Sequence, residues 1–188
     1  EEFFPSKKNF HFVTNKLHEL EGPFDLISLS HSIIYIPNFY QLINTISRLI
    51  KDDGVLFIQI PNIRTNPYYS LMGDQYFTFT EISLKNVLRK FGYRSEVIKN
   101  DYFPNELLIS AQKDEPSKSS ICDKDNYLDY AITTLDNSRR KLMKLRPPQL
   151  AVLGTTVNAA FVDELIGNKI KYFIDEDEYK IGKFFRGK

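Results

Sequence analysis

The sequence predicts a mixed α/β fold in which strands and helices alternate. Residues 24–29 and 55–60 are two nearly continuous apolar runs of strand length, which is typical of strands covered on both faces. Between them, apolar residues recur at the spacing of one helical face, at Phe39, Leu42, Ile43, Ile46, Leu49 and Ile50. A strand, a helix and a second strand with short connections favour a right-handed parallel crossover.

The boundaries of this first unit follow from local signals. Pro37 stands near the helix start, where its missing N–H is harmless. Residues 51–54 are expected to end the helix, with Gly54 supplying a left-handed or turn conformation. A further short strand is expected over residues 9–14.

A loop follows at residues 62–78. Its aromatic stretch, Tyr68–Phe79, could line a pocket or cap the core, and we expect it to cap the core. Thr80 is a good helix N-cap, and Gly92 stops the helix that it begins. Residues 93–98 and 106–112 are then expected to form two antiparallel strands.

The composition changes at Lys113, where a polar stretch without periodicity begins. A long helix over residues 124–145 and a second strand–helix–strand pattern, at 150–153, 158–166 and 170–174, follow. We therefore expect three parts: 1–113, the linker and long helix at 114–148, and a small α/β unit at 149–188.

Charge and composition exclude several classes of protein. The 188 residues carry 25 Lys and Arg against 24 Asp and Glu, which argues against a nucleic-acid partner. A single cysteine, Cys122, excludes an intrachain disulfide framework. The histidines His11, His18 and His31 lack the spacing of zinc motifs, so we expect no metal. No apolar run approaches the roughly 20 residues of a membrane span, so we expect a cytoplasmic protein without a membrane partner.

Polar residues follow both strands of the first unit. Ser30 and His31 come after the first strand, and Asn62 follows the second. Ligands of open parallel sheets bind outside the carboxyl ends of the strands, so these residues are candidate cofactor or substrate contacts. The alternative is a polar loop with a hydrogen-bonded structural histidine, and position alone favours neither.

A second candidate site is the turn that begins at Gly154. It lies between a strand and a helix, as in a phosphate-binding turn, and Asp175 ends the following strand. However, Thr156 and Ala159 stand where a dinucleotide-binding turn has glycines. A structural turn is therefore favoured over nucleotide binding.

Several segments together resemble a known family. They are residues 24–27, His31, 36–38, 49–56, 60–62, 76–80, Leu84, Leu88 and 91–93. In this order and spacing they resemble the second half of a Rossmann-type S-adenosylmethionine-dependent methyltransferase. Gly154, residues 174–175 and residues 180–187 are similar to the C-terminal domain of sugar C-methyltransferases.

The resemblance implies a partial Rossmann-like sheet, mostly parallel with an antiparallel terminal hairpin, plus a linker helix and a small second α/β unit. In that family a glycine-rich loop and an acidic residue hold the cofactor, and both are expected upstream of Glu1. No glycine precedes Gly22. We therefore expect this chain alone to bind S-adenosylmethionine weakly or not at all.

The resemblance also assigns roles to individual residues. It places Ser30 and His31 near the methionine end of the cofactor. It places Tyr35, Asp74, Gln75 and Tyr76 toward the acceptor, and we add Asn62 to the substrate contacts. Sugar C-methyltransferases carry a histidine where this chain has Tyr35, and a Glu–His pair where it has Asp74 and Gln75. Asp74, as base, and Tyr35 are the expected catalytic residues.

The resulting hypothesis is methyl transfer from S-adenosylmethionine to a sugar, such as a nucleotide-sugar, or to another small metabolite. The alternative is a non-catalytic, degenerate methyltransferase fold that binds a partner. Without strands before it, the strand at 24–29 would expose an apolar edge. A second copy of the chain or a partner protein is a candidate to cover it. The tail could also fill this gap, but the family pattern favours a separate small domain.

Overall fold

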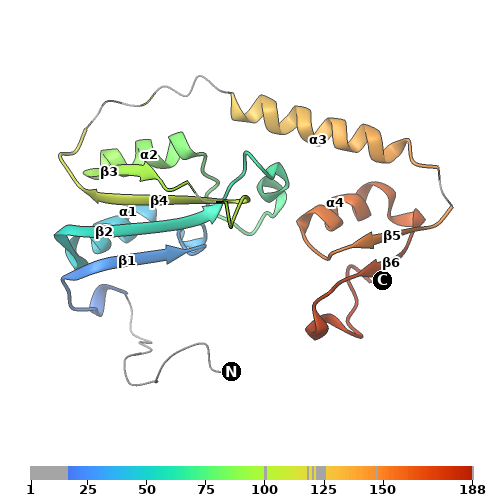
Figure 1. Ribbon diagram of the computed structural model, residues 1–188, viewed down its shortest axis with the longest axis horizontal. Coiled ribbons are helices and arrows are strands. Elements are labelled where there is room, and N and C mark those ends of the chain that lie inside the picture. The colour runs from blue at the N-terminus through green and yellow to red at the C-terminus, as the bar shows by residue number, and fades with distance from the viewer. Residues whose placement is uncertain are drawn as a thin grey trace.

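The computed structural model describes residues 17–99, 101–117, 119, 121, 126–146 and 148–187. It contains two sheets, with helix α3 (Tyr127–Met143) between them along the chain (Figure 1). The first unit is β1 (Phe24–Ser30), α1 (Phe39–Leu49) and β2 (Ile50–Pro61), and β1 and β2 are parallel. The predicted parallel pairing of two strands joined by a helix is confirmed. The strand expected over residues 9–14 and Cys122 lie outside the described residues.

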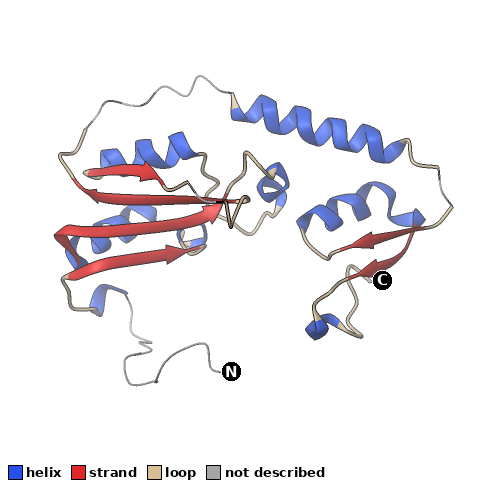
Figure 2. Ribbon diagram, in the orientation of Figure 1, coloured by secondary structure: helices blue, strands red, loops and turns tan. Residues whose placement is uncertain are grey.

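The larger sheet has the strand order β1-β2-β4-β3. Helix α2 (Glu81–Lys90) leads into β3 (Tyr93–Val97), and β4 (Glu106–Lys113) lies antiparallel between β2 and β3. Hence β1, β2 and β3 run in one direction and β4 runs in the other (Figure 2). The predicted fold class, a mostly parallel sheet that ends in an antiparallel hairpin, is confirmed.

One hydrophobic core fills the space between this sheet and the helices α1 and α2, which lie on the same side of it (Figure 1). The side chains of Ile43 on α1, Ile58 on β2 and Leu84 on α2 are fully buried. The aromatic loop adds Phe79, whose ring lies 5.7 Å from that of Phe39 between centroids. This part of the loop caps the core, as expected.

The helix boundaries follow from local chemistry. At α2 the Thr80 hydroxyl accepts a hydrogen bond from the Ser83 N–H (3.1 Å), and the Ser83 hydroxyl accepts one from the Thr80 N–H (2.8 Å). This reciprocal pair stabilises the helix start. Gly92 has φ +79°, so the predicted glycine stop is confirmed.

The prediction for Gly54 is wrong. The helix ends at Leu49, β2 begins at Ile50, and Gly54 lies within that strand without a positive φ. A Cβ at this position would lie 2.8 Å from Ile50 Cγ1 and 3.0 Å from the Phe24 carbonyl oxygen. Glycine is therefore required for close approach, at an irregular step in the β1–β2 register.

The C-terminal unit has its own two-stranded parallel sheet, made of β5 (Leu150–Leu153) and β6 (Ile170–Ile174) with α4 (Val157–Ile166) between them. The tail therefore does not extend the larger sheet. The loop after β2 contacts this unit, because the Tyr68 ring lies 5.1 Å from that of Phe161. The Ser70 hydroxyl also hydrogen-bonds the Tyr127 hydroxyl on α3 (2.7 Å).

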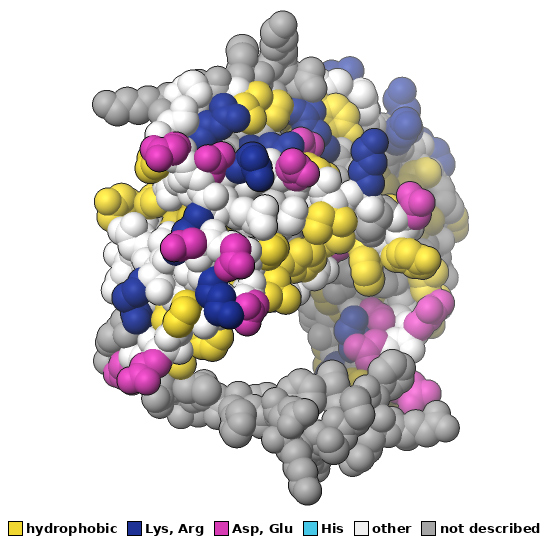
Figure 3. Space-filling view, turned by 60° about the vertical axis from the view of Figure 1, so that its left-hand side comes forward, with side chains coloured by type: hydrophobic (Ala, Val, Ile, Leu, Met, Phe, Trp, Pro, Cys, Tyr) yellow, Lys and Arg dark blue, Asp and Glu magenta, His cyan; other side chains and the backbone are white. Residues whose placement is uncertain are grey.

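Strand β1 forms one edge of the larger sheet within the described part of the chain. Its Leu26 is 59% exposed and Phe24 is 39% exposed. On the face shown in Figure 3, basic and acidic side chains are interspersed. Among the described residues, no helix is long and apolar enough to cross a membrane.

Candidate functional site

The predicted strand-end residues meet at one edge of the larger sheet. Ser30 is the last residue of β1, and Pro61, the last of β2, pairs with Glu106, the first of β4. The arrowheads of β1 and β2 in Figure 2 mark this edge, on the side toward the C-terminal unit. The sheet topology therefore places Ser30, His31, Asn62 and Glu106 in one region.

His31 is held by its backbone and faces a carboxylate. Its N–H donates to the Gln59 carbonyl oxygen (2.8 Å), and its φ is +52°, which is uncommon for a residue other than glycine. Its Nε2 lies 3.1 Å from Glu106 Oε2. The His31 side chain is 42% exposed and that of Glu106 is 15% exposed. The histidine therefore connects a partly buried acid to solvent.

Two further polar groups complete this edge. The Ser30 hydroxyl donates to the side-chain oxygen of Gln59 (3.1 Å). Asn62 begins a turn in which its side-chain oxygen accepts from the Arg64 N–H (3.1 Å). Its own N–H donates to the Asn105 carbonyl oxygen (2.7 Å), which joins the turn to the start of β4. The assignment of these residues to cofactor or substrate stays a prediction.

The predicted acceptor-side residues form a second group beside the short helix η3 (Ile33–Tyr35). The Tyr76 N–H donates to the Ile34 carbonyl oxygen (2.9 Å), so residues 74–76 lie along η3. Tyr35 and Tyr76 are exposed, as is Asp74. Gln75 Nε2 donates a hydrogen bond to the Met72 sulfur, at 3.5 Å. Within the described ranges no hydrogen-bond or ion-pair partner orients the Asp74 carboxylate, which weakens its case as a base.

Glu106 is the functional candidate that the sequence prediction missed. It precedes the apolar residues Leu107, Leu108 and Ile109 and was assigned only as a strand start. The first residue of an antiparallel strand lies at the same edge as the carboxyl ends of its neighbours. A lone acid at the head of an apolar strand was the available signal, but it needs the strand order to be useful.

Comparison with known proteins identifies the family. A family model described as a methyltransferase domain matches residues 3–97, just over half of the chain. The chain belongs to this methyltransferase family. The predicted family is confirmed, whereas no curated protein matches the chain.

Solved structures similar to this methyltransferase chain are distant in sequence. The DhpI–SAH complex is 14% identical, covers 57% of this chain and 56% of its own, and has a TM-score of 0.44. A SAM-dependent methyltransferase from Bacteroides fragilis in complex with S-adenosyl-L-homocysteine is 15% identical. The match covers 53% of this chain and 52% of that protein, with a TM-score of 0.39. Magnesium protoporphyrin IX methyltransferase from Synechocystis PCC 6803 is 16% identical. The match covers 54% of this chain and 50% of that protein, with a TM-score of 0.40. The chain spans about half the length of each.

The second candidate site of this methyltransferase chain, the turn at Gly154, has its acidic residue fully hydrogen-bonded within the chain. Gly154 has φ +88°, and Asp175 accepts hydrogen bonds from the Thr155 hydroxyl, from Lys180 Nζ (2.9 Å) and from the Asp177 N–H (3.1 Å). The Thr155 hydroxyl, then Lys180 and the Asp177 N–H, hold the pKa of the Asp175 carboxyl well below its usual range. Both carboxylate oxygens are occupied, which favours the structural turn over a nucleotide site.

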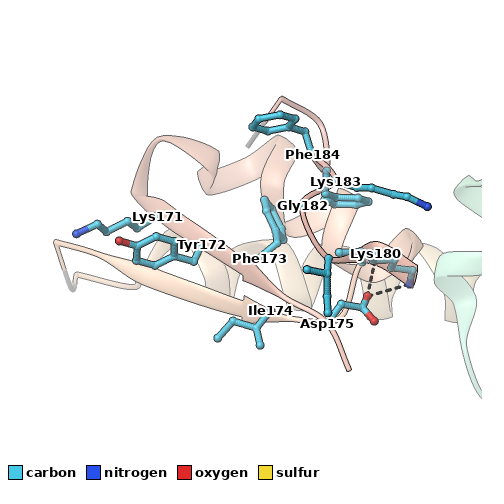
Figure 4. Close-up of a pocket in the computed structure, with 12 residues that line it drawn as sticks. Lys171, Tyr172, Phe173, Ile174, Asp175, Lys180, Gly182, Lys183 and Phe184 are labelled. Atoms are coloured by element: carbon cyan, nitrogen blue, oxygen red, sulfur yellow. Dashed lines mark hydrogen bonds and ion pairs between the residues drawn. The ribbon is translucent and has the colours of Figure 1, made fainter. Parts of the chain in front are cut away.

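A cavity of about 810 Å³ lies beside this turn, between β6 and residues 180–185 (Figure 4). The Phe173 ring contacts that of Phe185, with centroids 4.8 Å apart. Figure 4 shows Lys171 and Lys183 extending in opposite directions, and Lys180 is engaged by Asp175. The cavity has aromatic walls but no converging set of free polar groups among the residues described.

Proposed function

We propose that this chain is the C-terminal part of an enzyme that transfers a methyl group from S-adenosylmethionine to a small metabolite, with sugars and nucleotide-sugars as the acceptor class. The match to the methyltransferase model over residues 3–97 carries the proposal. The polar residues at the carboxyl ends of β1 and β2 support it, since ligands of such sheets bind at this edge.

The strand-end residues suit the polar methionine end of the methyl donor. The Ser30 hydroxyl offers a hydrogen bond, and Glu106 brings a partly buried carboxylate to the same edge. When bound, S-adenosylmethionine would supply an electrophilic methyl group. The chain would contribute orientation of the acceptor and exclusion of water, which supply much of the rate enhancement in reactions of this type.

The acceptor would lie toward Tyr35, Asp74, Gln75 and Tyr76. The hydrogen bond between Tyr76 and Ile34 supports this assignment, because it holds the four residues in one region. In this proposal Tyr35 and Asp74 are catalytic, while Gln75, Tyr76 and Asn62 bind the acceptor.

The test combines binding with turnover. Isothermal titration calorimetry with S-adenosylmethionine should give weak or no heat for the 188-residue chain, and micromolar binding would contradict the expected lack of the main cofactor loop. Isotope-labelled S-adenosylmethionine is then incubated with a panel of nucleotide-sugars and the protein from the complete reading frame. Labelled product supports the proposal, and no transfer to any acceptor overturns it.

A non-catalytic module is the second candidate function, and the exposed β1 edge favours it. Leu26 is 59% exposed at a strand with one unpaired side among the described residues. Exposed apolar edges invite pairing with another chain. A stable dimer or hetero-complex in sedimentation, lost in Leu26→Lys and accompanied by no methyl transfer, would favour the module over the enzyme.

A further inference from the structure

Glu106 presents a buried carboxylate oxygen that lacks a hydrogen bond. Its Oε2 is shielded from solvent, and no donor among the described residues has hydrogen-bond geometry toward it. Buried polar atoms are normally hydrogen-bonded, so a buried carboxylate oxygen without a hydrogen bond calls for an explanation, such as a functional role. The nearest charged or ionisable partner is His31, whose Nε2 lies at 3.1 Å. The distance is that of a hydrogen bond, and only the direction of the ring N–H departs from it.

The backbone places the His31 ring at this position. The left-handed conformation, φ +52°, and the hydrogen bond from the His31 N–H to the Gln59 carbonyl oxygen turn the chain sharply after β1. Non-glycine residues in this conformation cluster at functional sites. Along the described chain, the second ring nitrogen, Nδ1, has no hydrogen-bond partner, and the side chain is 42% exposed. One ring nitrogen therefore faces the acid, and the other is available to a ligand.

We propose that Glu106 is a positioning residue that keeps the ring proton of His31 on Nε2, and that His31 Nδ1 is the general base for the acceptor. A carboxylate that accepts from one ring nitrogen leaves the other as a proton acceptor, the logic of a histidine oriented by an acid. The reaction itself rests on the proposed function, whereas the Glu106–His31 pair does not.

The chemistry selects the class of acceptor. The acceptor's hydroxyl oxygen or amine nitrogen bonds to the methyl carbon while the carbon–sulfur bond breaks and its electron pair stays on sulfur. The proton of that hydroxyl or amine passes to His31 Nδ1. The products are the methylated acceptor, the neutral thioether and a protonated imidazole. The substrate is therefore a proton-bearing oxygen or nitrogen nucleophile, and His31 is the group that accepts its proton.

The first test is spectroscopic and needs no substrate. The ring nitrogens and ring protons of His31 are observed by ¹⁵N NMR in alkaline buffer and assigned with His31→Asn. We expect a slowly exchanging Nε2–H resonance in the wild-type chain and an Nδ1 shift typical of a bare nitrogen. Glu106→Leu should lose the slow resonance, while Glu106→Gln should retain it at a shifted position because its amide oxygen still accepts. Glu96→Gln, an exposed acid on β3, is the control and should change neither.

Two outcomes of this experiment would overturn the pairing. One is a wild-type His31 ring whose proton exchanges freely. The other is a folded Glu106→Leu chain whose His31 signals match those of the wild type. If Glu106→Leu does not fold, the pairing is still tested by the slow resonance of the wild type and by its shift in the near-isosteric Glu106→Gln.

The second test uses an acceptor that passes the labelling assay of the proposed function. His31→Asn should lower kcat at least about 100-fold, the usual contribution of a general base, which is a larger change than in the affinity for S-adenosylmethionine. Glu106→Leu should lower kcat to a similar extent, while the control Glu96→Gln, an exposed acid on β3, should stay within about threefold of wild type. A His31→Asn enzyme within tenfold of wild type overturns the catalytic role. Absence of transfer to every acceptor overturns the proposed function and this role together, and leaves the pairing to the NMR result.

Discussion

Truncation of two apolar side chains on neighbouring strands should have unequal effects. Ile58 on β2 is fully buried and lies in register with Leu29 of β1 and Ile109 of β4. Ile58→Ala removes three carbons, worth about 2.4 kcal/mol of transfer free energy. The cavity left behind adds about 1 kcal/mol or more. We expect a loss of about 3–4 kcal/mol in the free energy of unfolding.

Leu26→Ala on β1 is the matched control, since it also removes three carbons. Leu26 is 59% exposed, so only about two fifths of the transfer term is lost, about 1 kcal/mol. Urea unfolding followed by circular dichroism measures both, because the chain has no tryptophan. With a slope of about 2 kcal/mol/M, the midpoints should fall by about 1.5–2 M and about 0.5 M. Equal losses would refute the reasoning, because they would mean that β1 is covered in solution.

Three further predictions concern single contacts. Burial raises the pKa of the Tyr93 hydroxyl, so its neutral form is favoured in the fold and stability should fall as the pH rises above about 10. Tyr93→Phe should remove this alkaline loss, and an unchanged profile would contradict it. Because the pKa of Asp175 is lowered, the stability that it contributes is present above about pH 3.9 and is lost below it. In acid titrations followed by NMR, the signals of Thr155 should report this loss of stability, and Asp175→Asn should abolish the change. An acid transition at Thr155 that persists in Asp175→Asn would contradict the role of Asp175 in holding the turn. Thr80→Ala should cost about 1 kcal/mol in urea unfolding by removing the N-cap that pairs with Ser83, and no change would mean that the cap is dispensable.

Local sequence signals were sufficient for most elements of this fold. The helical spacing of Leu42, Ile43 and Ile46 predicted α1, and the apolar run at 55–60 predicted half of β2, because periodicity reflects the face that an element buries. The cap at Thr80 and the stop at Gly92 are equally local, since they depend on hydrogen bonds within a few residues. The prediction that Gly54 ends the helix was wrong. Glycine is needed at this position because the Phe24 carbonyl on the neighbouring strand comes close, and the local sequence does not reveal that contact.

The sequence by itself determined the element order, the methyltransferase resemblance and the polar residues that follow β1 and β2. Only the tertiary structure decided that β4 enters the sheet between β2 and β3, and so brings Glu106 to within 3.1 Å of His31. It also showed that both oxygens of Asp175 are occupied. The physical reason is that periodicity and capping act over a few residues, whereas the partner of a charged side chain depends on which distant strands become neighbours.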